Sequence, residues 1–256
     1  MLNGTIKFRA RIRGNGLTFP LLTFDPDTAR IEKVEIEGRR VESEGPNRSE
    51  IASTVYITEV PTEEMGKAIA ADANTKALDR LCFRYNIAIE NGQITGHQFS
   101  QLNPPPGYHL QANSGDYVIV DEAITLDLGI PAESVKAELE RLEYPGERYF
   151  ALYRSARQSE GRAEEFLQLY NLLLMLLGDE QNAVDDFIMR EAPGTPQTPS
   201  GKPRAKPGEK ETVYTRLRNE FAHVRKGTHL DHTKAQMTDR VGELANLTKK
   251  AIESYG

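Results

Sequence analysis

The hydrophobic residues of this chain repeat with one period in its first part and with another in its last part. From Ile6 to Arg13, apolar and basic residues alternate strictly. Since successive side chains of a strand point to opposite faces, this period of two predicts a half-buried strand with one basic face. The stretch RAEEFLQLYNLLLMLLGD, residues 162–179, carries its apolar residues at helical spacing. The two patterns predict a sheet followed by a helical region.

The first 130 residues are predicted to form an α+β domain, a small sheet with at least one helix packed on it. Further candidate strands cover residues 29–41, 53–60, 93–99 and 116–126. Between the second and third of these, the spacing is helical from Thr62 to Asn86, and Thr62 suits an N-terminal cap. The turn signal Asn91-Gly92 precedes the third.

Residues 131–256 are predicted to be an all-α bundle. Pro131 suits a first helical position, and helices are expected over residues 132–142, 147–158, 162–179, 180–191, 212–226 and 231–255. The segment between the predicted helices 180–191 and 212–226, residues 192–211, holds five prolines and almost nothing apolar. Such a composition cannot pack into a core, so this segment is predicted to be a mobile loop or a linker.

Composition limits the classes of partner and compartment. A chain of 256 residues has room for one large domain or two of ordinary size. Its formal charge of −6 restricts any nucleic-acid site to a local basic patch. The single cysteine, Cys82, allows no disulfide framework within the chain, which favours a reducing cytoplasm. The N-terminus has charges but no following apolar region, so no signal peptide is expected, and no apolar run has the length of a membrane span.

The most informative polar stretch is RLRNEFAHVRKG, residues 216–227. On a helical wheel at about 100° per residue, Asn219 and His223 lie one above the other, opposite an apolar stripe. Arg216 lies beside them, and the long side chain of Arg218 can reach toward the same patch. The same pattern is also typical of an ordinary solvated helix face, and Glu164 or Glu165 is a candidate partner for Arg218.

The sequence RNEFAH, residues 218–223, resembles the Arg-x4-His motif of the HEPN superfamily. The order of helices over residues 131–256 is similar to that of HEPN domains, in which the motif lies in a late helix behind a long one. Some toxin members have a tyrosine two residues after the histidine, where this chain has Arg225, so control through that tyrosine is not expected. The run ETVYTRLRNEFAHVRKGTHLDHTKAQM also resembles proteins of the methylamine utilization protein MauJ family.

The HEPN resemblance implies a metal-independent endoribonuclease that acts as a homodimer through its helical bundle. His223 would take a proton from a ribose 2′-hydroxyl, Arg218 would stabilise charge on the phosphate, and Asn219 would orient His223 or hold a phosphate oxygen. The products would be 2′,3′-cyclic phosphates and 5′-hydroxyls from single-stranded RNA, in the role of a stress or phage-defence effector. No cofactor is implied.

Local charge agrees with an RNA partner, although basic loops also serve solubility. Residues 200–226 hold eight Lys or Arg against three Glu. The residues expected to contact RNA are Arg216, Arg225, Lys226 and Lys210. The N-terminal domain is expected to sense a signal or to restrain the nuclease, with an unidentified ligand or protein as its partner.

Two other interpretations of the second region remain open. A HEPN domain that has lost activity would serve as a binding or dimerisation module, and a MauJ-like protein would be an accessory protein without enzymatic activity. A metal site among the histidines and aspartates of residues 223–239 is disfavoured, because their spacing matches no standard ligand set. His97 and His109 are predicted to be structural.

Overall fold

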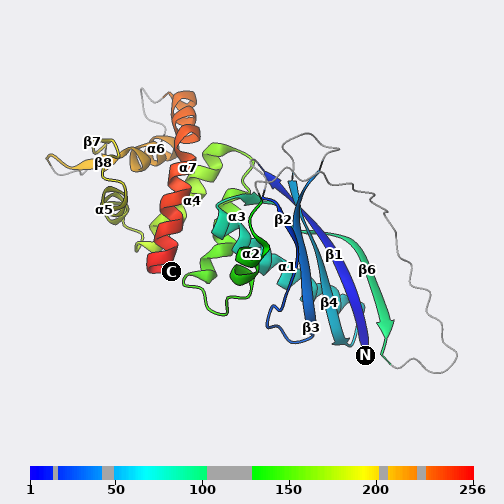
Figure 1. Ribbon diagram of the computed structural model, residues 1–256. Coiled ribbons are helices and arrows are strands. Elements are labelled where there is room, and N and C mark those ends of the chain that lie inside the picture. Colours follow the sequence, from blue (N-terminus) through cyan, green and yellow to red (C-terminus); the bar gives the residue numbers. More distant parts are fainter. Residues whose placement is uncertain (14–16, 42–48, 103–128, 202–206, 224–228) are drawn as a thin grey trace. The chain divides into compact units, whose positions relative to one another are not determined.

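The protein forms two compact units, Met1–Tyr144 and Pro145–Gly256 (Figure 1). The computed structural model describes residues 1–13, 17–41, 49–102, 129–201, 207–223 and 229–256. The candidate strand at 116–126 and the predicted structural residue His109 therefore lie outside the described residues. In the part of the chain that is described, no helix is long and apolar enough to cross a membrane.

The division between the units falls later in the chain than the predicted boundary after residue 130. Helix α2 (Ala132–Leu139), which was expected to open the helical bundle, packs against β2 (Phe19–Phe24) and α1 (Glu63–Tyr85) of the first unit. The Arg80 guanidinium of α1 donates a hydrogen bond to the Leu139 carbonyl at 2.7 Å, and Tyr144 packs edge-on against Phe83. These contacts make α2 and the residues after it, up to Tyr144, part of the first unit.

The first unit is built on an antiparallel sheet of six strands. The order along the sheet is β2-β3-β4-β1-β5, and β6 pairs with β1 on the same side as β5. The strands are β1 (Leu2–Arg13), β2 (Phe19–Phe24), β3 (Ile31–Arg40), β4 (Ser49–Val60), β5 (Ala88–Ile89) and β6 (Gln93–Gln101). The strand predicted from the alternation at Ile6–Arg13 is confirmed, with its apolar residues buried. Strand β2 has no counterpart among the predicted strands.

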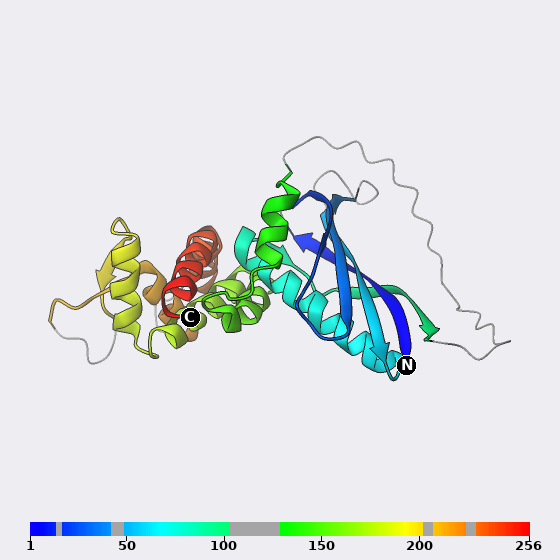
Figure 2. The ribbon, with the colours of Figure 1, turned by 60° about the horizontal axis from the view of Figure 1, so that its bottom comes forward.

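Helix α1 (Glu63–Tyr85) lies along one face of this sheet (Figures 1 and 2). Its N-terminal cap is Thr62, as predicted, whose side chain accepts a hydrogen bond from the Met65 N–H. The helix approaches closely at Gly66, where an added Cβ would lie 2.7 Å from the ring of Phe99 on β6. Cys82 is buried on the same helix.

The second unit is mainly helical, with a core between α4 and α7. Its elements are the 3₁₀ helix η2 (Glu147–Tyr149), α3 (Phe150–Arg157), α4 (Arg162–Leu176), α5 (Gln181–Glu191), β7 (Gln197–Pro199), β8 (Lys210–Thr212), α6 (Val213–Ala222) and α7 (Leu230–Tyr255). Phe166, Leu169 and Leu173 of α4 are fully buried, as are Leu244 and Ala251 of α7. The apolar stripe of residues 162–179 therefore forms the core that its helical period predicts.

The segment 192–211 differs from the mobile loop or linker that its composition predicts. Strands β7 and β8 pair antiparallel, from Gln197 opposite Thr212 to Pro199 opposite Lys210. Backbone pairing needs no apolar side chain, which explains why the composition gives no sign of it. Within this segment Glu211 is buried, and residues 202–206 lie outside the described part.

Helix α6 ends earlier than its pattern predicts. Its last helical residue is Ala222, and His223 is the C-terminal cap with φ −130° and ψ 79°. These backbone angles are not helical, so the predicted continuation of the helix to residue 226 was wrong from His223 onward. Residues 224–228 lie outside the described residues.

Candidate functional site

Helix α6, which carries the Arg-x4-His motif, is fixed at its N-terminal end by a buried carboxylate. Asp185 of α5 accepts hydrogen bonds at Oδ1 from the Thr212 N–H (3.0 Å), the Thr212 hydroxyl (2.6 Å) and the Thr215 hydroxyl (2.6 Å). The Thr212 hydroxyl also accepts from the Thr215 N–H at 3.4 Å, as an N-terminal cap does. This network orients α6 and therefore the motif residues further along it.

The same network extends to a buried tyrosine of α4. The hydroxyls of Tyr170 and Thr215 are 2.7 Å apart, and the Tyr170 ring is fully buried. Burial raises the pKa of the Tyr170 phenol above its usual range, because the phenolate would lose its hydration. The phenol therefore remains neutral at physiological pH and acts in the network as a hydrogen-bonding group.

Asn219 is the centre of the polar contacts within the motif. Its Oδ1 accepts hydrogen bonds from Gln181 Nε2 of α5 at 3.0 Å and from the neighbouring Arg218 Nη1 at 3.2 Å. Its Nδ2 donates to Glu211 Oε2 at 3.3 Å. The Asn219 amide is thus held between α5 and β8, and it in turn holds the guanidinium of Arg218.

Glu211 is one of the residues of this site that the sequence patterns do not indicate. Its side chain is only 3% exposed, and its second oxygen, Oε1, accepts from the Gly201 N–H at 3.3 Å. The carboxylate therefore joins the β7–β8 region to Asn219. The partners expected for Arg218 were Glu164 or Glu165, but Glu165 instead pairs with Arg157 and with Arg162, the latter at 2.9 Å.

His223 lies at the end of α6, where its N–H donates to the Asn219 carbonyl at 3.0 Å. The residue is exposed, and its backbone turns away from the helix. The structure thus places Arg218 and Asn219 in one bonded group and His223 one turn further along, at the surface. An exposed imidazole at a helix end is accessible to a substrate or to a second protein chain.

The four residues expected to contact RNA fall into different environments. Arg216 is occupied within the unit, because it donates to Glu220 Oε1 and to Gln236 Oε1 of α7, both at 2.7 Å. Lys210 is exposed on β8. Arg225 and Lys226 lie outside the described residues. Of the four, Lys210 is therefore the described residue with a side chain open to solvent.

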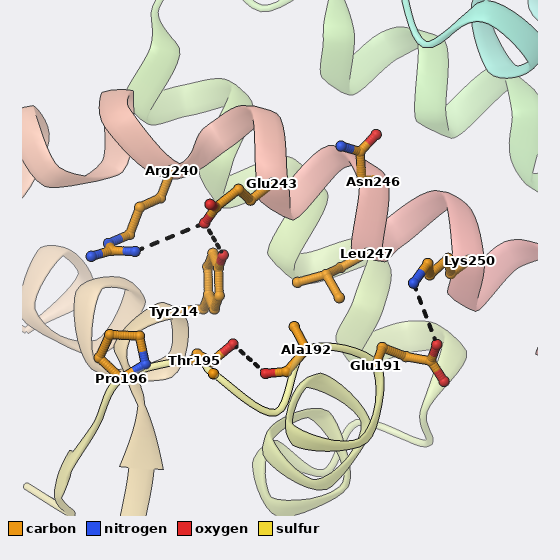
Figure 3. Close-up of a pocket in the computed structure, with 11 residues that line it drawn as sticks. Glu191, Ala192, Thr195, Pro196, Tyr214, Arg240, Glu243, Asn246, Leu247 and Lys250 are labelled. Carbon is orange, nitrogen blue, oxygen red and sulfur yellow. Dashed lines mark hydrogen bonds and ion pairs between the residues drawn. The ribbon is translucent and has the colours of Figure 1, made fainter.

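A cavity of about 420 Å³ lies elsewhere in this unit, between the end of α5, the loop after it, α6 and α7 (Figure 3). The Tyr214 hydroxyl donates to Glu243 Oε2 at 2.8 Å, and Arg240 approaches the same carboxylate at 3.8 Å. Lys250 is 3.6 Å from Glu191, and both residues line the cavity (Figure 3). Its charged groups are thus paired with one another, which gives no indication of a ligand.

Neither the metal-ligand geometry nor the comparisons with known proteins classify the site. Among the residues that the structure describes, no three His, Cys, Asp or Glu side chains are grouped as a metal ion requires. His97, in the first unit, lies 4.0 Å from Glu63 and beside the ring of Phe99.

Models of protein families, curated protein sequences and solved structures were compared with the chain, and none matches.

Proposed function

We propose that the second unit is a HEPN-type domain and that the protein is a metal-independent endoribonuclease acting on single-stranded RNA. The observation that carries the proposal is the Arg-x4-His motif on a short helix whose arginine is held by the Asn219 amide at 3.2 Å. A guanidinium held in place by a neighbour loses less conformational freedom when it binds a phosphate, which favours catalysis by a prepared charge.

In the proposed reaction, the His223 imidazole takes the proton of a ribose 2′-hydroxyl as the 2′-oxygen attacks the adjacent phosphorus. The bond from phosphorus to the 5′-oxygen of the next nucleotide breaks, and that oxygen takes a proton from solvent water to become a 5′-hydroxyl, while the His223 imidazolium returns its proton to the solvent. Arg218 stabilises the negative charge that increases on the phosphate oxygens. DNA is not a substrate, because it lacks the 2′-hydroxyl.

In this proposal Asn219 acts on Arg218 rather than on His223. Its amide is engaged with Glu211, Gln181 and Arg218, so it serves to position the guanidinium. The exposed position of His223 suits a site completed by a second copy of the chain, with Arg218 and His223 contributed by different protomers of a homodimer.

The test is cleavage of a mixed RNA pool by the purified full-length protein in EDTA. His223→Ala is expected to lower the rate by about 100-fold or more, as is usual for loss of a general base. Arg218→Ala is expected to lower it by about 100- to 1000-fold. The matched controls are His232→Ala, an exposed histidine of α7, and Arg190→Ala, an arginine with an exposed side chain on α5.

Both controls should cleave at the wild-type rate, and the 3′ ends should be cyclic phosphates. If the two residues act across a dimer, mixing the His223→Ala and Arg218→Ala proteins should restore activity, since each mixed dimer holds one intact site. A folded dimeric wild type that cuts no RNA, or motif variants that cut as fast as the controls, would contradict the proposal.

A second candidate function is a catalytically silent HEPN-like module that binds a partner, as a MauJ-like accessory protein would. The observation in its favour is that Arg218 and Asn219 make their hydrogen bonds inside the unit, within a network that also stabilises β8. In that case neither the wild type nor Arg218→Ala cuts RNA in the same assay, and Arg218→Ala lowers the stability of the protein.

A further inference from the structure

The first unit has a sheet face that no helix covers among the described residues. Helix α1 packs on the face that carries Ile6, Phe8 and Ser53, where the Ser53 hydroxyl donates to Asn74 Oδ1 of α1 at 2.7 Å. The other face carries the alternate residues of each strand. We refer to this second face as the open face.

The pairing register defines the composition of the open face. Residues directly opposite one another on neighbouring strands share a face. In the order β6, β1, β4 and β3, one row of neighbours is Gln98, Thr5, Tyr56 and Lys33, and the next is Gly96, Lys7, Thr54 and Glu35. The third row is Gln93, Arg9, Ala52 and Glu37. A fourth row, without a residue of β6, is Arg11, Glu50 and Arg39. Strand β1 thus presents Lys7, Arg9, Arg11 and, at its end, Arg13 in one line.

Positive charge is in excess along β1 and is balanced along β3. On β3, Lys33 bonds to Glu35 at 2.6 Å, and Arg39 lies 3.3 Å from Glu37. On β1, Arg9 lies 3.8 Å from Glu50, and that carboxylate is already bound by Arg39 at 2.7 Å.

The cations at the two ends of this line differ in their pairing, and β6 adds no negative charge beside them. Arg13 pairs with Glu90 at 3.1 Å, whereas Lys7 is exposed and makes no ion pair with the described residues. The residues of β6 that face the same side are uncharged. The cations of β1 repeat every two residues, about 7 Å apart, over a line of about 20 Å. A linear polyanion is the complement of such a line.

A cavity of about 320 Å³ lies where this line begins. Among the described residues that line it, Glu32 is the one that carries a charge; the others include Asn3 and Thr5 of β1, Gln98 and Ser100 of β6, and Tyr56 of β4. Amides and hydroxyls are groups that bind the edges of nucleic-acid bases, and an aromatic ring offers a surface on which a base stacks. Lys33 Nζ lies 4.2 Å from the centre of the Tyr56 ring, a position that a stacked base would take over.

We propose that the open face binds single-stranded nucleic acid, with the phosphates along Lys7, Arg9, Arg11 and Arg13 and a base in the cavity beside Tyr56. The combination of a cationic track with an aromatic platform is what single strands require, since their bases are free to stack on protein. This surface is in the first unit, and the inference does not depend on cleavage by the second.

The test measures binding rather than cleavage, with His223→Ala as the background so that the RNA stays intact. A fluorescent single-stranded RNA of about 12 nucleotides, within the range of known single-strand site sizes, is titrated with the full chain at several salt concentrations. The variant Lys7→Gln with Arg9→Gln should bind roughly tenfold more weakly, and its salt slope should fall by about 1.4, the value for two lost phosphate contacts.

The matched control has the same change in charge on the opposite side of the sheet. Lys67→Gln with Lys76→Gln lies on α1 and removes two cations whose partners are Glu63 and Asp72. It should bind RNA as the background protein does. Thermal unfolding of both double variants excludes misfolding as the cause of a difference.

The contribution of stacking is tested at Tyr56. Tyr56→Leu should weaken binding by about 5- to 150-fold, the range measured for loss of one base–aromatic stack, whereas Tyr56→Phe should bind nearly as well as Tyr56. A DNA strand of the same sequence shows whether the 2′-hydroxyl is read, and a duplex should bind more weakly than either strand.

Three results would overturn the inference. The first is no binding at low salt, and the second is equal affinity for the β1 and α1 double variants. The third is a loss of binding on Lys210→Gln that the β1 variant does not share, because the nucleic acid would then be held by the second unit. A protein that binds through the open face but cuts nothing supports this inference and counts against the proposed nuclease.

Discussion

At the scale of single residues, the contacts of Asn219 change how the motif is interpreted. A helical wheel pairs Asn219 with His223, since they are four residues apart. The structure instead gives its side chain to Glu211, Gln181 and Arg218. Glu211 and Gln181 come from elements outside α6, so no periodicity within the motif indicates them. This is the reason to regard Asn219 as a positioning residue for the guanidinium.

The buried phenol of Tyr170 predicts a dependence of stability on alkaline pH. Because burial raises its pKa, the folded phenol keeps its proton at a pH where the unfolded phenol, with a pKa near 10, has lost it. The folded state then binds more protons, so the free energy of unfolding decreases as pH rises above about 10, by at most about 1.4 kcal/mol per pH unit for this group.

Urea unfolding of wild type and Tyr170→Phe between pH 8 and pH 11 measures this effect. The variant should be less stable by about 0.5–1.5 kcal/mol at pH 8, for loss of the bond to Thr215, and should decline less steeply above pH 10. Tyr255→Phe, at an exposed position, is the matched control. Parallel pH profiles for Tyr170→Phe and wild type would show that this phenol does not contribute to the pH dependence of the free energy of unfolding.

At the scale of elements, the close approach of α1 to the sheet depends on a glycine. Replacing a helical glycine by alanine usually stabilises a helix by about 0.8–1.0 kcal/mol. At Gly66 the added methyl group would lie 2.7 Å from the Phe99 ring, which is itself buried. We therefore expect Gly66→Ala to lower the free energy of unfolding by about 1–3 kcal/mol, because the helix or the ring must move.

Gly242→Ala provides the matched control for this prediction. Gly242 lies within α7, and nothing is found within 4 Å of the position of its added Cβ. Its substitution should stabilise the protein by the usual helical amount, so the two glycine variants are expected to differ in sign. A stabilising Gly66→Ala in chemical denaturation would mean that α1 and β6 do not pack as closely as described.

At the scale of the whole molecule, the chain consists of two units with separate cores. One core lies between the sheet and α1, and the other between α4 and α7. Hydrogen exchange of the Gly66→Ala protein tests this division. Exchange should become faster in β1, β4 and α1, and should stay unchanged in α4 and α7. Faster exchange in α4 and α7 as well would indicate that the units unfold together.

Much of this architecture is predictable from local patterns. The alternation in β1 and the stripe of α4 identify their buried faces, because each pattern reflects which side of one element avoids water. The boundary between the units is less predictable. Helix α2 has an amphipathic pattern that suits either neighbour, and its contacts with β2 and α1 decide to which unit it belongs.

The sequence by itself determined the order of a sheet region and a helical region, the cap at Thr62, and the motif residues Arg218, Asn219 and His223 as candidates. These depend on neighbours within one element, where spacing along the chain fixes spacing in space. The tertiary structure decided the burial of Glu211, its contact with Asn219, and the neighbours that the basic face of β1 has on β4 and β6. Each of these arises when segments distant in sequence pair or pack, and the free energy of such contacts leaves no period in the sequence.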